Sequence, residues 1–387
     1  MLYLVSPVYA PNSATTNRMK GYYSALDKMR VEATIIYLYP DNAKNRQTDD
    51  YKHLKIVHLW DKGIYTNKLL RLLSMLINVW RLYFMVDNGD IVYTYGINRI
   101  TKLMLSKRQV KIFAERTEYL DLMTRDALNI SKRKLIKVAR RLDGLIVISR
   151  ALKQEFVTNG VDESKIVVVN MTVDSNRFVS LQRQSLKDRY IAYCGSVSNV
   201  KDGVDILIKA FSIVAEKLID VKLYIIGNYS SSIEQVSNYE LIRSLGIEDR
   251  IVFTGAISHE EMPQMLKDAD LLVLARPNNE QARCGFPTKL GEYLLTENPV
   301  VVTAVGDIPI FLKDNESAFL PEPNDVPAFA EKIIWALENC DAAKEVGRRG
   351  RLIALKEFNN GIETSKLIKF IEICTNLTLA KHENCNS

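Results

Sequence analysis

Short apolar runs recur along the whole chain, and segments of helical periodicity separate them. In the first half, the runs expected to form strands are Leu2–Val5, Thr34–Leu38, Lys55–Leu59, Ile91–Thr94, Lys111–Ala114, Leu145–Ile148 and Ile166–Val169. In the second half they are Tyr190–Cys194, Lys222–Ile226, Arg250–Phe253, Leu271–Leu274, Val300–Thr303 and Ala318–Leu320. Strands that alternate with helices predict parallel sheets. The two sets therefore predict an α/β protein with two doubly wound domains that face one another across a cleft.

A polar segment without periodicity, SNRFVSLQRQSLKD, marks the seam between the two sets. We expect an N-terminal domain at residues 1–180, a C-terminal domain at 181–365, and a helix and tail at 366–387, for which packing on the N-terminal domain is one option. A length of 387 residues permits about two domains. The hydrophobic content of 47% and charged content of 25% are typical of soluble globular proteins.

The cysteines and the ends of the chain favour a cytoplasmic protein. Five cysteines are scattered along the sequence, and none has a spacing typical of zinc ligands. A reducing compartment fits this usage, and no metal is expected. The N-terminus does not resemble a signal peptide. The longest apolar stretch, Ile64–Val86, is interrupted by Lys68, Arg71, Asn78 and Arg81, and predicts an amphipathic helix rather than a membrane span.

Charge is unevenly distributed between the two halves. Residues 1–180 contain 29 Lys and Arg against 17 Asp and Glu, a net charge of +12, whereas the remainder has a net charge of −6. A basic N-terminal half favours an anionic partner, such as phospholipid, a lipid diphosphate or nucleic acid. No nucleic-acid-binding motif is present, so we expect no nucleic-acid partner.

Ligands of parallel sheets bind at the loops that follow the strands, and two such loops stand out in the first half. The loop after Val5 carries candidate acceptor or phosphate contacts, namely Ser13, Thr15, Thr16 and Arg18. For its hydroxyl residues, simple helix capping is the alternative. The loop after Ala114 carries Glu115 and Glu118, candidate catalytic carboxylates. A solvated charged loop is the alternative reading there.

Two loops of the second half favour an anionic ligand. After Cys194, Gly195 permits close backbone approach, and Lys201 precedes a helix, where a surface lysine is the alternative. The loop after Leu274 brings Arg276, Glu280 and Arg283 ahead of the segment CGFPTKLGEYLLTENPVVV. That segment predicts a glycine loop, a helix N-terminus with Lys289 beside it, and Glu292 one turn later. A helix N-terminus and a lysine suit a phosphate, and Glu292 suits ribose or sugar hydroxyls; an ordinary surface pair of Lys289 and Glu292 is the alternative.

Along nearly its whole length the chain resembles the retaining GT-B glycosyltransferases of family 4, also called glycosyl transferases group 1. The resemblance rests on segments found in order: DGLIVISRALKQEF, NMTVDSNRF, YCGSVSNVKDGVDILIKAF, LYIIGNY, IVFTGAISHEEMPQMLKDADLLVLARP and GFPTKLGEYLLTENPVVVT. It implies two Rossmann-like domains, with a nucleotide sugar donor held mainly by the second. It also implies transfer of the sugar with retention of configuration, without a bound metal or cofactor.

The resemblance assigns roles to individual residues. It places Lys201 on the donor diphosphate, Glu292 on the ribose, and the backbone of Gly285, Phe286 and Pro287 along the donor sugar. Thr288 and Lys289 would face the diphosphate from the start of the helix. We therefore expect the donor site to comprise Gly195, Ser196, Lys201, Arg276, Glu280, Arg283, Cys284, Gly285, Phe286, Pro287, Thr288, Lys289 and Glu292, with Glu115, Glu118 and Lys201 as catalytic candidates.

The sequence departs from the family pattern at two positions. Cys284 stands where the family has the first glutamate of its motif, and Ser196 stands where it usually has an arginine. Arg276 or Arg283 are the candidates to restore the missing cation, and Glu280 to replace the carboxylate. A non-catalytic sugar-nucleotide or polysaccharide-binding relative is therefore the competing interpretation. An oxidoreductase is disfavoured because no GxGxxG follows the first strand of either half.

The acceptor is expected to be a glycan or lipid-linked saccharide of a surface polysaccharide, such as lipopolysaccharide or capsule. The segment Ser131–Arg141 places six cations on one predicted helix. With the Ile64–Val86 helix it would rest on an anionic leaflet, and a solvated basic face is the alternative. The expected location is the cytoplasm, including the inner face of the plasma membrane.

Overall fold

The protein divides into two compact units, which are described separately. A computed structural model describes residues 1–9, 13–40, 49–60, 68–107, 109–122, 130–184 and 188–380. The first unit comprises Met1–Asn170 and the segment that begins at Asn360, and the second comprises Met171–Asn359. The seam lies at Asn170, ahead of the polar segment from which we placed it. The predicted tail at Asn384–Ser387 lies outside the described residues.

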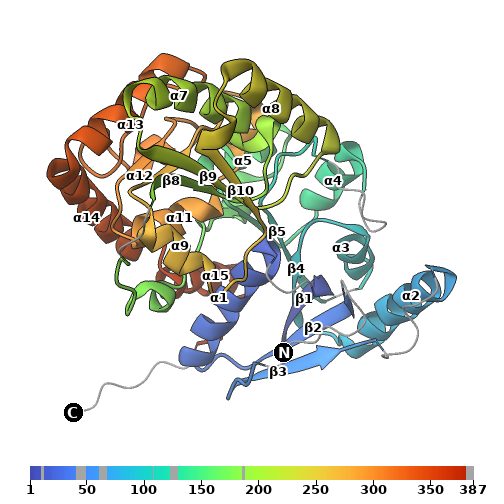
Figure 1. The fold of residues 1–387 in the computed structure, drawn as a ribbon. Coiled ribbons are helices and arrows are strands. Elements are labelled where there is room, and N and C mark those ends of the chain that lie inside the picture. Colours follow the sequence, from blue (N-terminus) through green and yellow to red (C-terminus); the bar gives the residue numbers. More distant parts are fainter. Residues whose placement is uncertain are drawn as a thin grey trace, which may run out of the picture. The chain divides into compact units, whose positions relative to one another are not determined.

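The first unit contains a parallel sheet of seven strands in the order β3-β2-β1-β4-β5-β6-β7 (Figure 1). The strands are β1 (Leu2–Tyr9), β2 (Ala33–Pro40), β3 (Leu54–His58), β4 (Ile91–Tyr95), β5 (Lys111–Arg116), β6 (Gly144–Val147) and β7 (Ile166–Val168). The chain starts in the middle of the sheet, moves to one edge and then crosses to the other. The switch point therefore lies between β1 and β4, where ligand sites of such sheets form.

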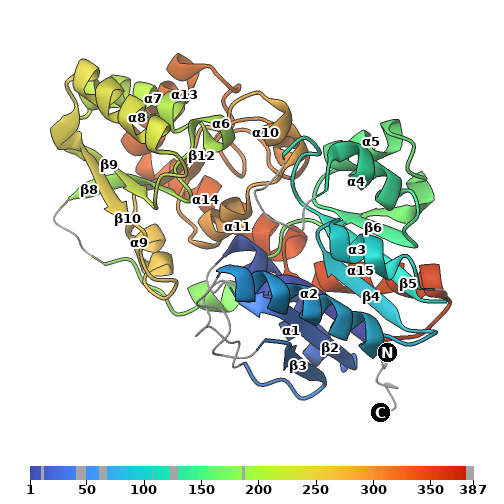
Figure 2. The same cartoon turned by 90° about the vertical axis from the view of Figure 1, so that its right-hand side faces the viewer.

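Helices cover both faces of this sheet. They are α1 (Ala14–Lys28), α2 (Lys68–Met85), α3 (Arg99–Met104), α4 (Lys132–Ala139), α5 (Arg150–Thr158) and α15 (Asn360–Thr375). Helices α1 and α15 share one apolar core with the sheet, to which Tyr23, Leu26, Leu367 and Ile371 contribute. Helices α2 and α3 lie on the opposite face (Figure 2). The C-terminal helix thus belongs to the first unit because its apolar side completes that core.

The second unit is built on a parallel sheet in the order β10-β9-β8-β11-β12. Its strands are β8 (Arg189–Cys194), β9 (Val221–Ile226), β10 (Ile251–Gly255), β11 (Leu271–Leu274) and β12 (Val300–Val302). Its helices are α6 (Asn199–Asp202), α7 (Val204–Lys217), α8 (Ser232–Leu245), α9 (Met262–Asp268), α10 (Glu280–Cys284), α11 (Thr288–Leu295), α12 (Ile308–Phe311), α13 (Val326–Glu338) and α14 (Cys340–Glu357). Loops at the carboxyl ends of β8 and β11 therefore lie side by side, since these strands are neighbours.

The predicted α/β class and its two doubly wound sheets are confirmed. Each predicted strand before Ala318 is present, with bounds that differ by a few residues. Ala318–Leu320 does not form a strand and contributes only an isolated bridge between Val301 and Phe319. In the described part of the chain, no helix has the length and hydropathy needed to cross a membrane.

Glu363 fastens the C-terminal helix to the first unit. Its carboxylate is fully buried and accepts a hydrogen bond of 2.6 Å from the backbone N–H of Asn170. Lys366 provides its counter-ion. The carboxylate thus joins the last residue of the first chain segment to the helix that returns from the second unit.

Replacing Glu363 by alanine should destabilise the first unit by about 1–3 kcal/mol, because the buried N–H of Asn170 loses its acceptor. Glu363→Gln keeps an acceptor oxygen and should lose less. Lys369→Ala, on the exposed side of the same helix, is the control and should change stability by less than about 0.5 kcal/mol. Urea unfolding followed by circular dichroism measures these differences. Equal stability of Glu363→Ala and Lys369→Ala would show that the carboxylate does not fasten the helix.

Candidate functional site

The turn after β8 brings the backbone close to a lysine from another part of the chain. A Cβ atom at Gly195 would overlap the Lys289 ammonium, so glycine lets the lysine approach the turn without being displaced. Tyr293, on the same helix as Lys289, fixes the turn through its hydroxyl. That hydroxyl accepts from the N–H of Cys194 at 2.6 Å and donates to its carbonyl at 3.3 Å. The helix α11 is thereby held against the carboxyl end of β8.

The buried carboxylate of Asp202 accepts hydrogen bonds from Lys289 and from Tyr193. Asp202 ends the short helix α6 and is 2% exposed. Its Oδ2 accepts from Lys289 Nζ at 2.6 Å and from the Tyr193 hydroxyl at 2.9 Å. The Lys289 ammonium also lies 4.6 Å from the centre of the Tyr193 ring. Gly203, which follows, has a φ of 65°, and a Cβ there would collide with the carbonyl of Ala275.

Asp202, Lys289 and Arg276 form a charged cluster, in which Arg276 is the second cation that acts on Asp202. It follows β11, is 1% exposed, and donates from Nη2 to the carbonyl of Ala282 at 3.1 Å. Its backbone carbonyl accepts from Thr303 Oγ1 at 2.7 Å, which fixes the segment to the end of β12. These two hydrogen bonds fix both the guanidinium and the backbone of Arg276.

The charges of the cluster depend on one another. Burial lowers the pKa of Lys289, although Asp202 favours its charged form. Burial also disfavours the ionised form of Asp202, but Lys289 and Arg276 outweigh it and hold the pKa of this carboxyl below its ordinary value. Burial raises the pKa of the Cys194 thiol to about 12, so it is not a thiolate nucleophile at neutral pH. Asp202 is thus a carboxylate whose charge keeps Lys289 beside the glycine turn.

Glu292 lies one turn after Lys289 and pairs with a different residue. Its Oε1 accepts from Arg177 Nη1 at 2.5 Å, and Arg177 Nη2 donates to the carbonyl of His259 at 2.6 Å. Burial raises the pKa of Glu292, and the cation of Arg177 opposes that shift. The side chain is 24% exposed, so part of the carboxylate faces solvent.

The remaining residues predicted around the second-unit site fall into three groups. Glu280 and Arg283 form an ion pair with each other, and both side chains are half-exposed. Cys284, Gly285, Phe286 and Pro287 are buried, and Phe286 packs its ring against Phe311 and Phe358. Ser196 is exposed, while Lys201 and Thr288 are partly exposed. Pro287 stands at the N-terminus of α11, whose first turn receives no hydrogen bond from a capping side chain.

In the first unit, Arg18 and Glu115 form a buried ion pair. They are 4% and 1% exposed, and Arg18 Nε donates to Glu115 Oε1 at 2.5 Å. The same guanidinium donates to the carbonyls of Asn170 and Val169 at 2.7 and 2.9 Å. Tyr93 donates to the other oxygen of Glu115. These contacts bury both side chains and give them a structural role. The catalytic role expected of Glu115 and the phosphate contact expected of Arg18 stay predictions.

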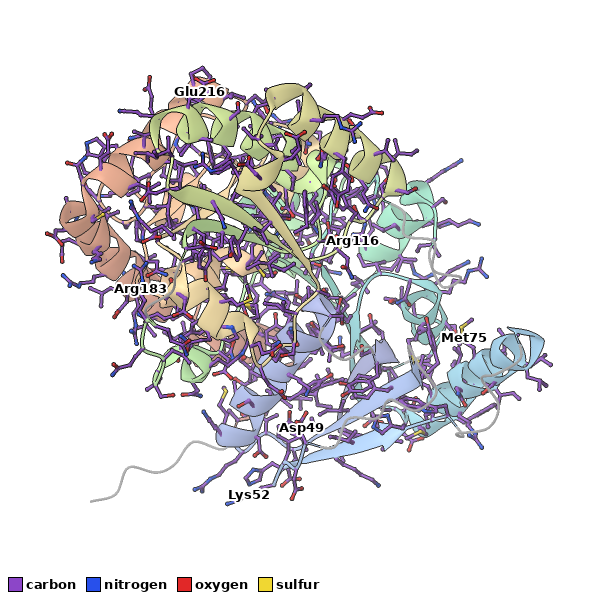
Figure 3. The ribbon with its side chains drawn as sticks, viewed as in Figure 1. Asp49, Lys52, Met75, Arg116, Arg183 and Glu216 are labelled. Atoms are coloured by element: carbon purple, nitrogen blue, oxygen red, sulfur yellow. The ribbon has the colours of Figure 1, made fainter. Side chains whose placement is uncertain are left out.

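The other first-unit candidates are buried or partly exposed. Ser13 caps α1 by accepting from the N–H of Thr16 at 3.1 Å, which is the alternative left open for it, and Thr16 is buried. Thr15 and Glu118 are partly exposed. Arg116, labelled in Figure 3, braces the loop by donating to the carbonyls of Glu118, Tyr119 and Leu122.

Sequence reasoning missed Asp202, Tyr193, Arg177 and Tyr293. Asp202 pairs with a lysine 87 residues away, and Arg177 with a glutamate 115 residues away. The sequence signal available for Asp202 was its position between Lys201 and Gly203, in the segment after the first strand of the second unit. Among the described residues, no group of three or more His, Cys, Asp or Glu side chains is arranged to hold a metal ion.

Known proteins resemble this chain in sequence. Residues 188–339 match the model of the family described as glycosyl transferases group 1. The D-inositol 3-phosphate glycosyltransferase of Mycolicibacterium smegmatis is 28% identical over 218 residues, which cover 54% of this chain and 48% of that protein. The amylovoran biosynthesis glycosyltransferase AmsK of Erwinia amylovora is 23% identical over 368 residues, which cover 90% of this chain and 88% of that protein. This chain therefore spans about half the length of the first relative and most of the second.

The fold is shared with a solved structure. The Anabaena protein Alr3699/HepE in complex with UDP-glucose superposes with a TM-score of 0.71 at 16% identity, covering 97% of this chain and 100% of that chain. The architecture is therefore GT-B, as the resemblance implied. Together these likenesses support a glycosyltransferase. The part of the chain that matches the family model contains Asp202, Arg276 and Lys289.

Removing one partner of the buried Arg18–Glu115 pair should cost more stability than removing one partner of an exposed ion pair. Arg18→Met leaves a buried carboxylate without its counter-ion and should cost about 3–5 kcal/mol. Arg18→Met combined with Glu115→Gln should recover part of that loss, because no charge stays buried. Arg133→Met, on the exposed face of α4, is the matched control. Denaturant unfolding of the wild type and these three variants measures the changes in free energy of unfolding, and a cost for Arg18→Met no larger than that for Arg133→Met would contradict the structural role.

Proposed function

We propose that this protein transfers a sugar from a nucleotide diphosphate sugar to a saccharide or lipid-linked acceptor, with retention of configuration. The observation that carries the proposal is the cluster of Lys289, Arg276 and Asp202 at the N-terminus of α11. HepE, which has the same fold, was solved with UDP-glucose, and this supports a nucleotide sugar as donor. AmsK, which is similar over most of the chain, is a glycosyltransferase of polysaccharide biosynthesis, and this supports a polysaccharide role.

The charge of the cluster suits a diphosphate without a metal ion. Lys201, Arg276 and Lys289 contribute three positive charges and Asp202 one negative charge, which leaves a net +2. A diphosphate esterified on both sides carries about two negative charges, because each phosphate keeps one acidic oxygen. The N–H groups at the start of α11 add donors for the same oxygens. The proposed site thus balances the donor with protein groups alone.

In the proposed reaction these groups stabilise the departing diphosphate. The bond between the anomeric carbon and the diphosphate oxygen breaks while a bond to the acceptor hydroxyl oxygen forms. The hydroxyl proton passes to the diphosphate oxygen that leaves, so the products are the glycoside and the nucleoside diphosphate. Catalysis then consists of positioning the two substrates and stabilising the charge that develops on the leaving group. Lys201 and Lys289 are the residues assigned to that charge.

A second candidate function is that of a binding protein without transfer activity. Two observations favour it: Cys284 is buried at the position of a family carboxylate, and Ser196 occupies the position of a family cation. A protein that only binds sugar nucleotides or polysaccharide would show no turnover, whereas transfer requires it. Release of nucleoside diphosphate from a nucleotide sugar in the presence of an acceptor separates them. Proton NMR of the product then shows whether the anomeric configuration is retained, and inversion would contradict the proposed stereochemistry.

Nucleotide binding should depend on Lys201. A thermal-shift panel of UDP, GDP, ADP and their sugars identifies the nucleotide that raises the melting temperature. For that nucleotide, Lys201→Met should weaken binding by about 10- to 100-fold, the value of one charge-assisted hydrogen bond. The matched control is Lys344→Met, an exposed lysine on a helix of the same unit. Equal affinity of the two variants, measured by titration calorimetry, would remove Lys201 from the site.

Affinity for the donor should also depend on pH through Glu292. Burial raises its pKa above the ordinary value of 4.5. A carboxylate accepts ribose hydrogen bonds better than its protonated form does. Affinity should therefore be full above the raised pKa and should fall as the pH drops through it, in a range that begins above 4.5. UDP-glucose is the suitable probe because its diphosphate keeps its charge across that range.

Glu292→Gln provides the control for this pH dependence. It should bind UDP-glucose more weakly at neutral pH, and its affinity should stay constant across the range in which the wild-type affinity falls. An identical pH profile of the two proteins would assign the titration to another group.

A further inference from the structure

Helix α2 of the first unit has an apolar face turned to solvent. Its exposed apolar residues recur every three or four positions and are Leu70, Leu73, Leu76, Ile77, Trp80 and Phe84. Trp80 and Phe84 are 52% and 74% exposed. Hydrophobic residues scattered singly on a surface are ordinary, whereas a continuous stripe of this kind marks an interaction site.

The buried side of the same helix contains polar residues. Ser74 and Asn78 are buried together with Met75 and Leu82. Asn78 Nδ2 donates to the carbonyl of Leu38 at 2.8 Å, which attaches α2 to β2. Figure 3 labels Met75 on this helix. The usual arrangement of a surface helix, apolar inside and polar outside, is therefore partly reversed.

Aromatic rings gather at the C-terminal end of the stripe. The rings of Trp80, Tyr83 and Phe84 pack with centroid distances between 5.6 and 6.1 Å. Ile77, Trp80, Arg81, Phe84 and Met85 line a hollow with His58 and Leu59 at the end of β3. Lys107 holds its ammonium 4.6 Å from the Tyr83 ring centre. Indole and phenol rings flanked by a cation are typical of a surface that meets the interface of a lipid bilayer.

A basic hollow lies beside α2, between α3 and α4. Among the described residues it is lined by Arg99, Lys102 and Lys134 together with Leu103, Ser106, Ile130 and Ser131, and none of these is acidic. Helices α2 and α3 are neighbours on the same face of the sheet (Figure 2). The three cations and two hydroxyl groups can hold the phosphate of a headgroup.

We propose that α2 docks the first unit on an anionic lipid bilayer, with the apolar stripe inserted among the acyl chains and the basic hollow on the lipid phosphates. The net charge of the N-terminal half favours an anionic bilayer over a second copy of the protein as the partner of this surface. Residues 1–180 carry a net charge of +12, so two copies joined through this face would bring like charges together. An anionic leaflet supplies both an apolar layer and the opposite charge. The inference does not depend on the transfer reaction, because it rests on different residues.

The full-length protein and extruded vesicles test the proposal. One set of vesicles contains phosphatidylcholine alone, and the other contains equal parts of phosphatidylcholine and phosphatidylglycerol. The protein should co-sediment with the second set, and the binding should weaken as salt rises from about 50 to about 300 mM. Equal binding to the two sets, or no binding to either, would overturn the proposal.

Two variants separate the apolar and the charged contributions. Trp80→Gln with Phe84→Gln should lower the partition coefficient by about 10-fold or more. Arg99→Gln with Lys102→Gln and Lys134→Gln should lower it too, and should reduce its dependence on salt. The matched control is Ile219→Gln with Leu352→Gln, which are 83% and 66% exposed in the second unit. Melting temperatures equal to that of the wild type would show that each variant is folded. If the control variant lost as much vesicle binding as the other two variants, the proposal would be overturned.

Fluorescence locates the inserted side chain. The chain has three tryptophans, so in a Trp60→Phe/Trp335→Phe background Trp80 is the sole emitter. Vesicles whose acyl chains carry bromine should quench it and shift its emission to shorter wavelength. Absence of quenching in protein that co-sediments would place α2 outside the bilayer and overturn the inserted geometry. Sedimentation velocity tests the alternative of a second copy. If the wild type were a dimer and Trp80→Gln/Phe84→Gln a monomer, the apolar stripe would be assigned to a dimer interface instead.

Discussion

The ion pair between Lys289 and Asp202 determines the form of the second-unit site. A lysine buried beside a glycine turn requires a carboxylate, because the desolvation of an unpaired ammonium would be too costly. Asp202 meets that requirement, and its own position is fixed by Gly203, whose left-handed backbone lets α6 end against Ala275. Tyr193 and Tyr293 then hold the turn from both sides. The loop after β8 and the start of α11 are thus placed by one charge pair and the glycines that make room for it.

The first unit uses the same chemistry for a different purpose. Arg18 and Glu115 also form a buried pair at the carboxyl end of a sheet, but both partners are covered and their hydrogen-bonding groups are occupied by Tyr93 and by two backbone carbonyls. In the second unit Glu292 is partly exposed and pairs with Arg177 through one oxygen. A charged residue after a strand is a candidate ligand contact only where its oxygen atoms remain accessible to solvent. Glu292 meets this condition, and Glu115 does not.

Much of the fold could be predicted from the sequence, because a buried parallel strand requires a continuous apolar run that is visible locally. The strands before Ala318 follow this rule, and Val300–Val302 is a clear case. Ala318–Leu320 has the composition of a strand but pairs through a single bridge, which depends on distant residues. Lys289 and Glu292 could be chosen as candidates because loop and helix signals are local. Their partners Asp202 and Arg177 were not, because spacing along the chain does not show which charges meet.

The two departures from the family pattern can be understood through the charge of the cluster. In the proposed donor site a serine at position 196 provides no cation, and the buried Arg276, in the loop after β11, is the candidate that would supply one. Arg283, the other candidate for that cation, pairs with Glu280 at the surface. Cys284 lies buried at the end of α10, where an ionised glutamate would need a partner of its own. With a neutral residue there, Asp202 is the carboxylate paired with Lys289, and the proposed site would keep a positive net charge for a diphosphate.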